Sequence, residues 1–113
     1  MRYVAGLVAA LILVQGALAG SHLTGASGAL GVHEMLGTVV ITTLALIAIL
    51  LGALAFSEGR WLPVVAVAGF VGIWIQLMMG FSDRLEVHVP LGIALFGLYL
   101  GVAAWRPARR ERS

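Results

Sequence analysis

Two histidines in this chain lie in matching sequence surroundings, and histidine is the side chain that most often binds metals in proteins. Each histidine opens an apolar segment within the pattern H-x-x-L-G, and a glutamine stands near the end of the apolar segment before it. The first copy is Gln15 with His33–Gly37, and the second is Gln76 with His88–Gly92. Because imidazole in a membrane is costly to leave without a partner, the matched pair predicts a common ligand.

Two imidazoles on facing helices suit the axial ligation of a haem iron. The sequence therefore predicts that His33 and His88 are the metal ligands of a non-covalently bound haem b. The chain has no cysteine, which excludes iron–sulfur ligation and the C-x-x-C-H attachment of c-type haem. A haem with both axial positions filled by histidine is suited to electron transfer.

Further residues around the pair are predicted to contact the haem. Gly37 and Gly92 each follow a histidine by four residues, one helical turn, and leave room for a planar ligand. Gln15 and Gln76 can donate hydrogen bonds to a propionate or orient an imidazole. Arg84 can pair with a propionate from the adjacent loop, as can other polar loop residues, namely Ser82, Thr24 and His22. We otherwise interpret His22 as an exposed loop residue.

The segments that must position these residues are apolar throughout. The chain has 113 residues, 61% hydrophobic and 11% charged, more apolar surface than a soluble domain of this size can bury. Four runs of about 18 to 25 residues are each long enough to cross a bilayer core of about 30 Å as a helix. They are Tyr3–Gly20, Val32–Phe56, Trp61–Phe81 and Val87–Trp105. We predict an all-α membrane protein, with residues 1–113 forming one domain of four transmembrane helices in an up-down bundle.

The polar loop Ser57–Arg60 divides the bundle into two helical hairpins. Since both hairpins have the same topology, we predict that they are pseudo-equivalent and related by a twofold axis along the membrane normal. The internal repeat is imperfect, because the glutamine precedes the histidine by 18 positions in the first half and by 12 in the second. The axis would still place both histidines at similar depth.

The arginines predict the orientation. Both termini and the middle loop lie on one side, which holds six arginines, and the other side holds only Arg84. By the positive-inside rule this predicts a multi-pass protein of the cytoplasmic (inner) membrane with both termini cytoplasmic. The six are Arg2, Arg60, Arg106, Arg109, Arg110 and Arg112. The sequence pI of about 9.9 reflects this orientation in the lipid bilayer, and no nucleic-acid partner is expected.

The start of the chain could also be interpreted as a signal peptide, because Ala17–Ala19 forms an A-x-A pattern before Gly20. The first segment, however, carries Gln15 in the place where the third carries Gln76. A discarded leader has no reason to match a later helix, so we expect this segment to be retained.

These residues resemble one four-helix half of haem A synthase, and also small uncharacterised bacterial membrane proteins with the same paired Gln/His motifs. The resemblance covers the four-helix plan, Gln15, His33, His88 and the segment Gln76–Gly80. It implies that histidines at the outer ends of the second and fourth helices hold one haem. The synthase has a glutamate three residues before its second-helix histidine, where this chain has Leu30. The resemblance therefore implies a redox carrier or haem-binding protein more than an oxygenase.

The leading hypothesis is a cytochrome b-like protein for electron transfer. A single haem near the outer face cannot carry electrons across about 30 Å of membrane. We therefore expect a quinone, a second haem in a homodimer, or a larger respiratory complex as its partner.

Two alternatives remain open. The chain can be a non-enzymatic accessory subunit of a larger membrane complex without a cofactor, its glycine-rich faces packing against that complex. A metal or proton pathway would use the polar residues His22, His33, Glu34, Glu86 and His88. This pathway is disfavoured because the inner halves of the spans lack ionisable residues.

Overall fold

The apolar runs form four long helices, and the prediction of an all-helical, four-helix chain is confirmed. The computed structural model describes residues 1–107, and Arg109, Arg110 and Arg112 of the orientation prediction lie outside the described residues. The helices are α1 (Arg2–Leu23), α2 (Ala29–Met35), α3 (Thr42–Leu54), α4 (Trp61–Phe81) and α5 (Leu85–Ala104). A π-helical segment, Leu36–Ile41, joins α2 to α3, so that Ala29–Leu54 is one continuous helical span.

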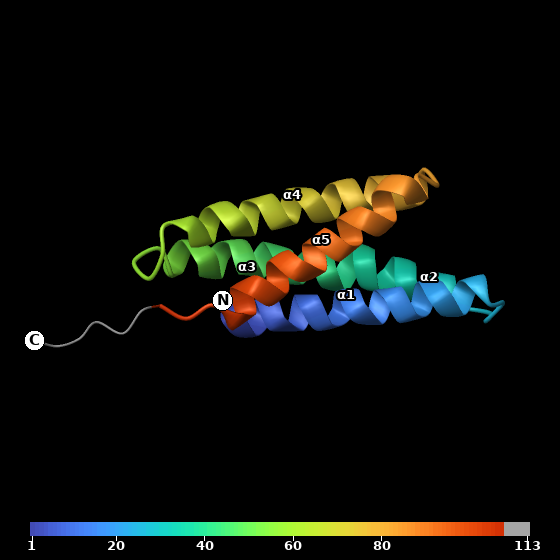
Figure 1. Cartoon of the computed structure of the whole chain (residues 1–113), viewed down its shortest axis with the longest axis horizontal. Helices are drawn as coiled ribbons and strands as arrows, with labels where there is room; N and C mark the ends of the chain where they lie inside the picture. Colours follow the sequence, from blue (N-terminus) through green and yellow to red (C-terminus); the bar gives the residue numbers. More distant parts are fainter. Residues whose placement is uncertain (108–113) are drawn as a thin grey trace, which may run out of the picture.

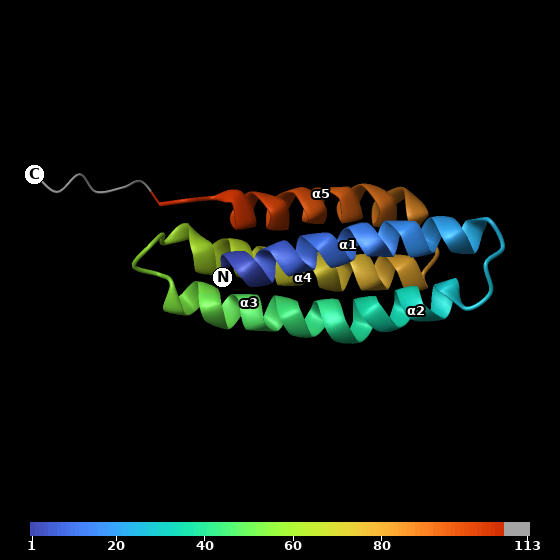
Figure 2. The same ribbon diagram turned by 90° about the horizontal axis from the view of Figure 1, so that it is seen from below.

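The helices run up and down in sequence and form two hairpins, α1 with α2–α3 and α4 with α5 (Figures 1 and 2). The chain starts at one end of the bundle, here called the terminal end, where α3 also connects to α4. The opposite end carries the connections 24–28 and 82–84 and is here called the histidine end. Helix α5 crosses the bundle obliquely in Figure 1 and packs against both α1 and α4.

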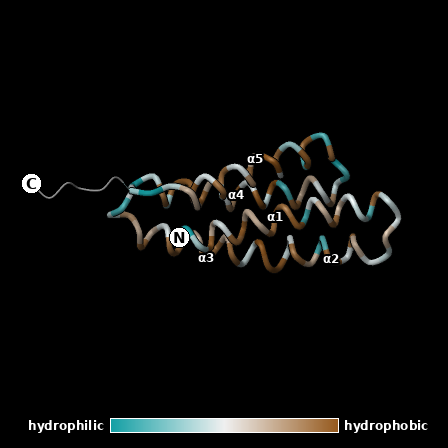
Figure 3. Tube along the Cα trace, turned by 60° about the horizontal axis from the view of Figure 1, so that its bottom comes forward, coloured by the Kyte–Doolittle hydropathy of each residue, from teal (hydrophilic) through white to brown (hydrophobic). Residues whose placement is uncertain are grey.

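The helical surface is apolar and the core consists mostly of small residues. Leu13, Val64 and Ile93 are each 65 to 68% exposed, whereas Ala5, Ala45 and Ala48 are fully buried. Hydrophobic residues extend along the helices, and hydrophilic residues gather mainly near their ends (Figure 3). Small residues inside and large apolar residues outside are typical of helices packed in lipid. All four spans are long and apolar enough to cross a membrane.

The two hairpins lie close together at the terminal end. A Cβ atom on Gly6 of α1 would lie 3.6 Å from the Cβ atom of Ala103 on α5. A Cβ atom on Gly52 of α3 would lie 3.2 Å from the main-chain oxygen of Leu62 on α4. The first distance is an ordinary van der Waals contact, whereas the second is tighter, so glycine at position 52 permits the close approach of α3 and α4.

The helices differ from their expected limits mainly at the histidine end. The first helix continues to Leu23 and the second begins at Ala29, so the expected loop 21–31 shortens to 24–28. The chain reverses there through Gly25 and Gly28, whose φ angles of 93° and 81° suit glycine. The last helix begins at Leu85 rather than residue 87, and the second and fourth end at Leu54 and Ala104.

The π-helical segment lies directly after His33. Gly37 and the β-branched residues that follow it through Ile41 are weak α-helix formers. The Thr42 hydroxyl donates to the main-chain oxygen of Gly37, five residues earlier, at 2.8 Å. A π turn holds about one residue more than an α turn, so it absorbs one extra residue while both flanking helices keep their faces. The segment therefore sets the direction of His33 relative to α3.

Deletion of Val40 should be tolerated, because it converts the π segment into regular α-helix without rotating α2 against α3. We expect the thermal unfolding midpoint in detergent, followed by circular dichroism, to fall by less than about 8 °C. Deletion of Ala94 in the regular helix α5 is the control, since it rotates one half of that helix by about 100°. That deletion should lower the midpoint by more than about 15 °C. Equal losses would contradict this role of the π segment.

Candidate functional site

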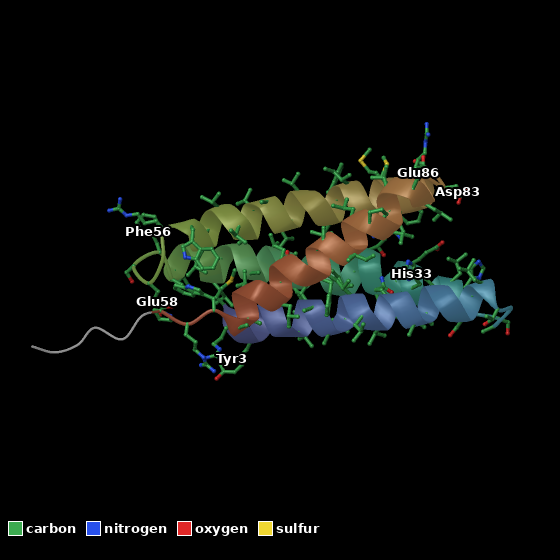
Figure 4. All side chains as sticks on the ribbon, in the orientation of Figure 1. Tyr3, His33, Phe56, Glu58, Asp83 and Glu86 are labelled. Carbon is green, nitrogen blue, oxygen red and sulfur yellow. The ribbon has the colours of Figure 1, made fainter. Side chains whose placement is uncertain are left out.

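The structure brings His33 and His88 together from different hairpins. His33 lies on α2 and His88 lies near the start of α5, and Figure 4 shows His33 near the histidine end of the bundle. The centroids of the two rings are 6.1 Å apart, and the ring planes make an angle of 60°. Both side chains are partly buried.

Each imidazole is held by a main-chain carbonyl of the helix beside it. His33 Nδ1 lies 3.1 Å from the oxygen of Gln15, and His88 Nδ1 lies 2.8 Å from the oxygen of Gln76. Because a carbonyl oxygen can only accept, Nδ1 carries the proton in both rings. In the neutral ring of this tautomer, Nε2 has the lone pair that a metal can bind.

The two glutamine side chains behave differently. Gln15 Nε2 donates to the main-chain oxygen of His33 at 2.8 Å, which links α1 to α2 and fixes the orientation of this amide. The side chain of Gln76 makes no hydrogen bond to any residue in the range 1–107. Oε1 of each glutamine is buried and has no partner among residues 1–107. The glutamines therefore orient the imidazoles through their main-chain oxygens, and the Gln76 amide is free to bind something else.

Glycines make room for these side chains. A Cβ atom on Gly37 would lie 3.0 Å from Gln15 Nε2, and one on Gly92 would lie 2.9 Å from Gln76 Nε2. A Cβ atom on Gly80 of α4 would lie 2.8 Å from Cε1 of His88. The predicted space beside Gly37 and Gly92 thus contains the glutamine amides, and Gly80 admits the imidazole of His88.

The histidines and glutamines line an apolar cavity of about 340 Å³ at the histidine end. Its walls come from α1, α2, α4, α5 and the π-helical segment. Gly37 of that segment and Gly92 of α5 are among the lining residues. This volume is in the range of small-molecule and cofactor sites, which are commonly apolar with a few convergent polar groups. Six of the seven site residues proposed from the sequence therefore line one cavity.

Arg84 is the seventh, and it does not line this cavity. Its guanidinium lies 3.4 Å from Glu86, both side chains being about two-thirds exposed, so the pair contributes little to stability. His22 lies in the last turn of α1, not in a loop, and lines the cavity together with Glu34. Thr24 donates its hydroxyl to the main chain of Ser21.

The donor set of this site is two imidazoles. Within residues 1–107, no group of three or more His, Asp or Glu side chains is placed to hold a metal ion. A metal–imidazole nitrogen bond is about 2 Å long, and ring atoms lie about 1.15 Å from the centroid of a ring with bonds of about 1.35 Å. Two imidazoles on opposite sides of one metal atom would thus have centroids about 6.3 Å apart. The observed 6.1 Å fits this arrangement.

Sequence reasoning identified the residue pairs but missed how they are joined. The main-chain oxygens of Gln15 and Gln76 are the imidazole partners, and no side-chain pattern reports a main-chain acceptor. The contact of Gly80 with His88 was not predicted, although Gly80 follows Gln76 by four residues and lies on the same helical face. That spacing was the available signal for its contact with His88.

Comparison with protein-family models, curated proteins and solved structures finds no match to this chain.

Proposed function

We propose that this chain is an integral membrane b-type haem-binding protein that transfers electrons, with His33 and His88 as the axial ligands. The observation that carries the proposal is the pair of imidazoles at 6.1 Å, each tied through Nδ1 to a main-chain oxygen. Such outer contacts fix the tautomer and raise the basicity of a metal-binding histidine.

The surroundings of the pair support a large planar ligand. The cavity is mainly apolar in its lining, which also includes the charged residues Glu34 and Asp83, and helices bound it on several sides. Gln15 Oε1 and Gln76 Oε1 are buried polar atoms without partners, which is common where a ligand completes a site. The residues present therefore fit a haem.

Each residue of the chain has a distinct task in this proposal. His33 and His88 bind through Nε2, and the main-chain oxygens of Gln15 and Gln76 hold the rings in place. The apolar walls exclude water from the site. A bound haem would supply a one-electron couple, and His33 and His88 would both hold it, so that no ligand position would remain for a substrate. For this reason we propose electron transfer rather than oxygenation.

The proposed setting is the cytoplasmic membrane, with the histidine end on the outer side and both termini in the cytoplasm. The apolar surface of the four spans and the arginine distribution support this placement. The two hairpins are proposed to be related by an approximate twofold axis, which the matched Nδ1 contacts favour.

The test is an absorption spectrum of the full chain, purified from membranes of cells supplied with a haem precursor. We expect a Soret band, sharp α and β bands after reduction with dithionite, and no spectral change with carbon monoxide. A protein purified under these conditions without a Soret band would contradict the proposal. In that case the accessory-subunit alternative would gain support, because it predicts a stable bundle without haem.

A further inference from the structure

A second cavity, of about 270 Å³, meets the histidine pair from the side of the bundle. It shares eight of its twelve lining residues with the first cavity, among them Gln15, His33, Gln76 and His88, and is therefore a lateral extension of that cavity. Its other walls come only from α1 and α5. We call this second cavity the α1–α5 cleft.

The α1–α5 cleft opens towards the apolar surface of the helices. Leu13 of α1 and Ile93 of α5 line it and are 65% and 68% exposed. No Arg, Asp or Glu lines it, and a Cβ atom on Gly16 would meet nothing within 4 Å. In a membrane this opening faces acyl chains, so the cleft is accessible to a lipid-soluble ligand rather than to a water-soluble one.

The cleft also contains a polar group that is not one of the proposed iron ligands. Haem would engage the two imidazoles, and the Gln15 amide is already bonded to His33. The Gln76 amide lines the cleft, and no described residue accepts from its Nε2 or donates to its Oε1. A buried polar group without a partner is costly, so a ligand that bonds this amide would bind favourably.

We propose that the α1–α5 cleft binds the head group of a lipid-soluble quinone, with Gln76 as its hydrogen-bonding residue. An amide suits both redox forms, because Nε2 can donate to a quinone carbonyl and Oε1 can accept from a quinol hydroxyl. The isoprenoid tail would leave through the opening past Leu13 and Ile93. The redox role of the quinone rests on the proposed function, because the haem would be its electron-transfer partner. Binding of the quinone to the cleft does not require haem.

The test uses the full chain, as purified, in phosphatidylcholine nanodiscs with a short-chain azido-ubiquinone as photoaffinity probe. We expect label on α1 near Leu13 and on α5 between Val89 and Phe96, displaced by excess ubiquinone-2. Gly16→Leu should fill the cleft and Gln76→Leu should remove the hydrogen bond, each lowering competable labelling about tenfold. Gly97→Leu is the matched control, because Gly97 on α5 is equally open and lines neither cavity.

The possible outcomes separate this inference from the proposed function. Label spread over all four helices, or label that ubiquinone-2 does not displace, would mean that acyl chains fill the cleft, and would overturn the inference. Equal labelling in Gly16→Leu and Gly97→Leu would overturn it as well. Competable labelling in a protein that lacks a Soret band would support the cleft while contradicting haem binding.

Discussion

Replacement of His33 or His88 by alanine is expected to abolish the six-coordinate haem spectrum. Each histidine would supply one of two axial bonds, and neither cavity contains a methionine or a lysine that could replace it. We expect haem affinity to fall at least about a hundredfold in each variant, a loss of about 2.7 kcal/mol. Haem that remains should be high-spin and should bind carbon monoxide. Absorption spectra during haem titration measure both effects.

Added imidazole should partly restore the six-coordinate spectrum of His33→Ala and His88→Ala, because it can occupy the space that each ring leaves. His22→Ala is the matched control, since His22 lines the same cavity but is exposed and lies outside the pair. That variant should retain the spectrum and the affinity of the unmodified chain. If only His22→Ala lost the six-coordinate spectrum, the assignment of His33 and His88 as the axial ligands would be wrong.

Gly80→Ala is expected to displace His88 although alanine favours the helix. An added Cβ atom at Gly80 would lie 2.8 Å from Cε1 and 3.0 Å from Nδ1 of His88, closer than side chains normally approach. The ring must move, and its 2.8 Å contact with the Gln76 oxygen would be strained or broken. Loss of such an orienting contact typically costs about 10- to 100-fold in metal affinity. Haem titration followed at the Soret band checks this expectation.

Gly20→Ala is the matched control for Gly80→Ala. Gly20 lies near the end of α1, as Gly80 does near the end of α4, but a Cβ atom there would meet nothing within 4 Å. Both substitutions should raise intrinsic helix stability by about 1 kcal/mol. Only Gly80→Ala should weaken haem binding. Equal affinities in the two variants would show that His88 can bind from another position.

The fold follows from the sequence because it depends on properties that single segments carry. Trp61–Phe81 forms α4 with the expected limits, since Arg60 precedes this long apolar run and Ser82 follows it. The observed helix limits differ from the expected ones where polar residues continue a helix. Gly20 and Ser21 were expected to end the first helix, but both keep helical geometry, and the helix continues to Leu23, two residues before Gly25.

The candidate site was predictable as a set of residues but not as a set of bonds. The spacing of Gln15, His33, Gln76 and His88 places them at one end of the bundle. Whether a glutamine acts through its amide or its main-chain oxygen depends on how two helices approach each other, and no local pattern encodes that distance. The ion pair between the exposed side chains of Arg84 and Glu86 was not predictable either, because it depends on the direction of the connection 82–84.

The close contacts at Gly6 and Gly52 have a mechanical consequence for the histidine pair. They let the hairpins approach each other at the terminal end, while a cavity lies between them at the histidine end. The hairpins thus lie close together at the terminal end and enclose the histidine pair and its cavity at the histidine end. Gly52 is 19 residues from His33, about 28 Å along the helix, so we expect a side chain added at Gly52 that tilts α3 against α4 to change the distance between the two histidines.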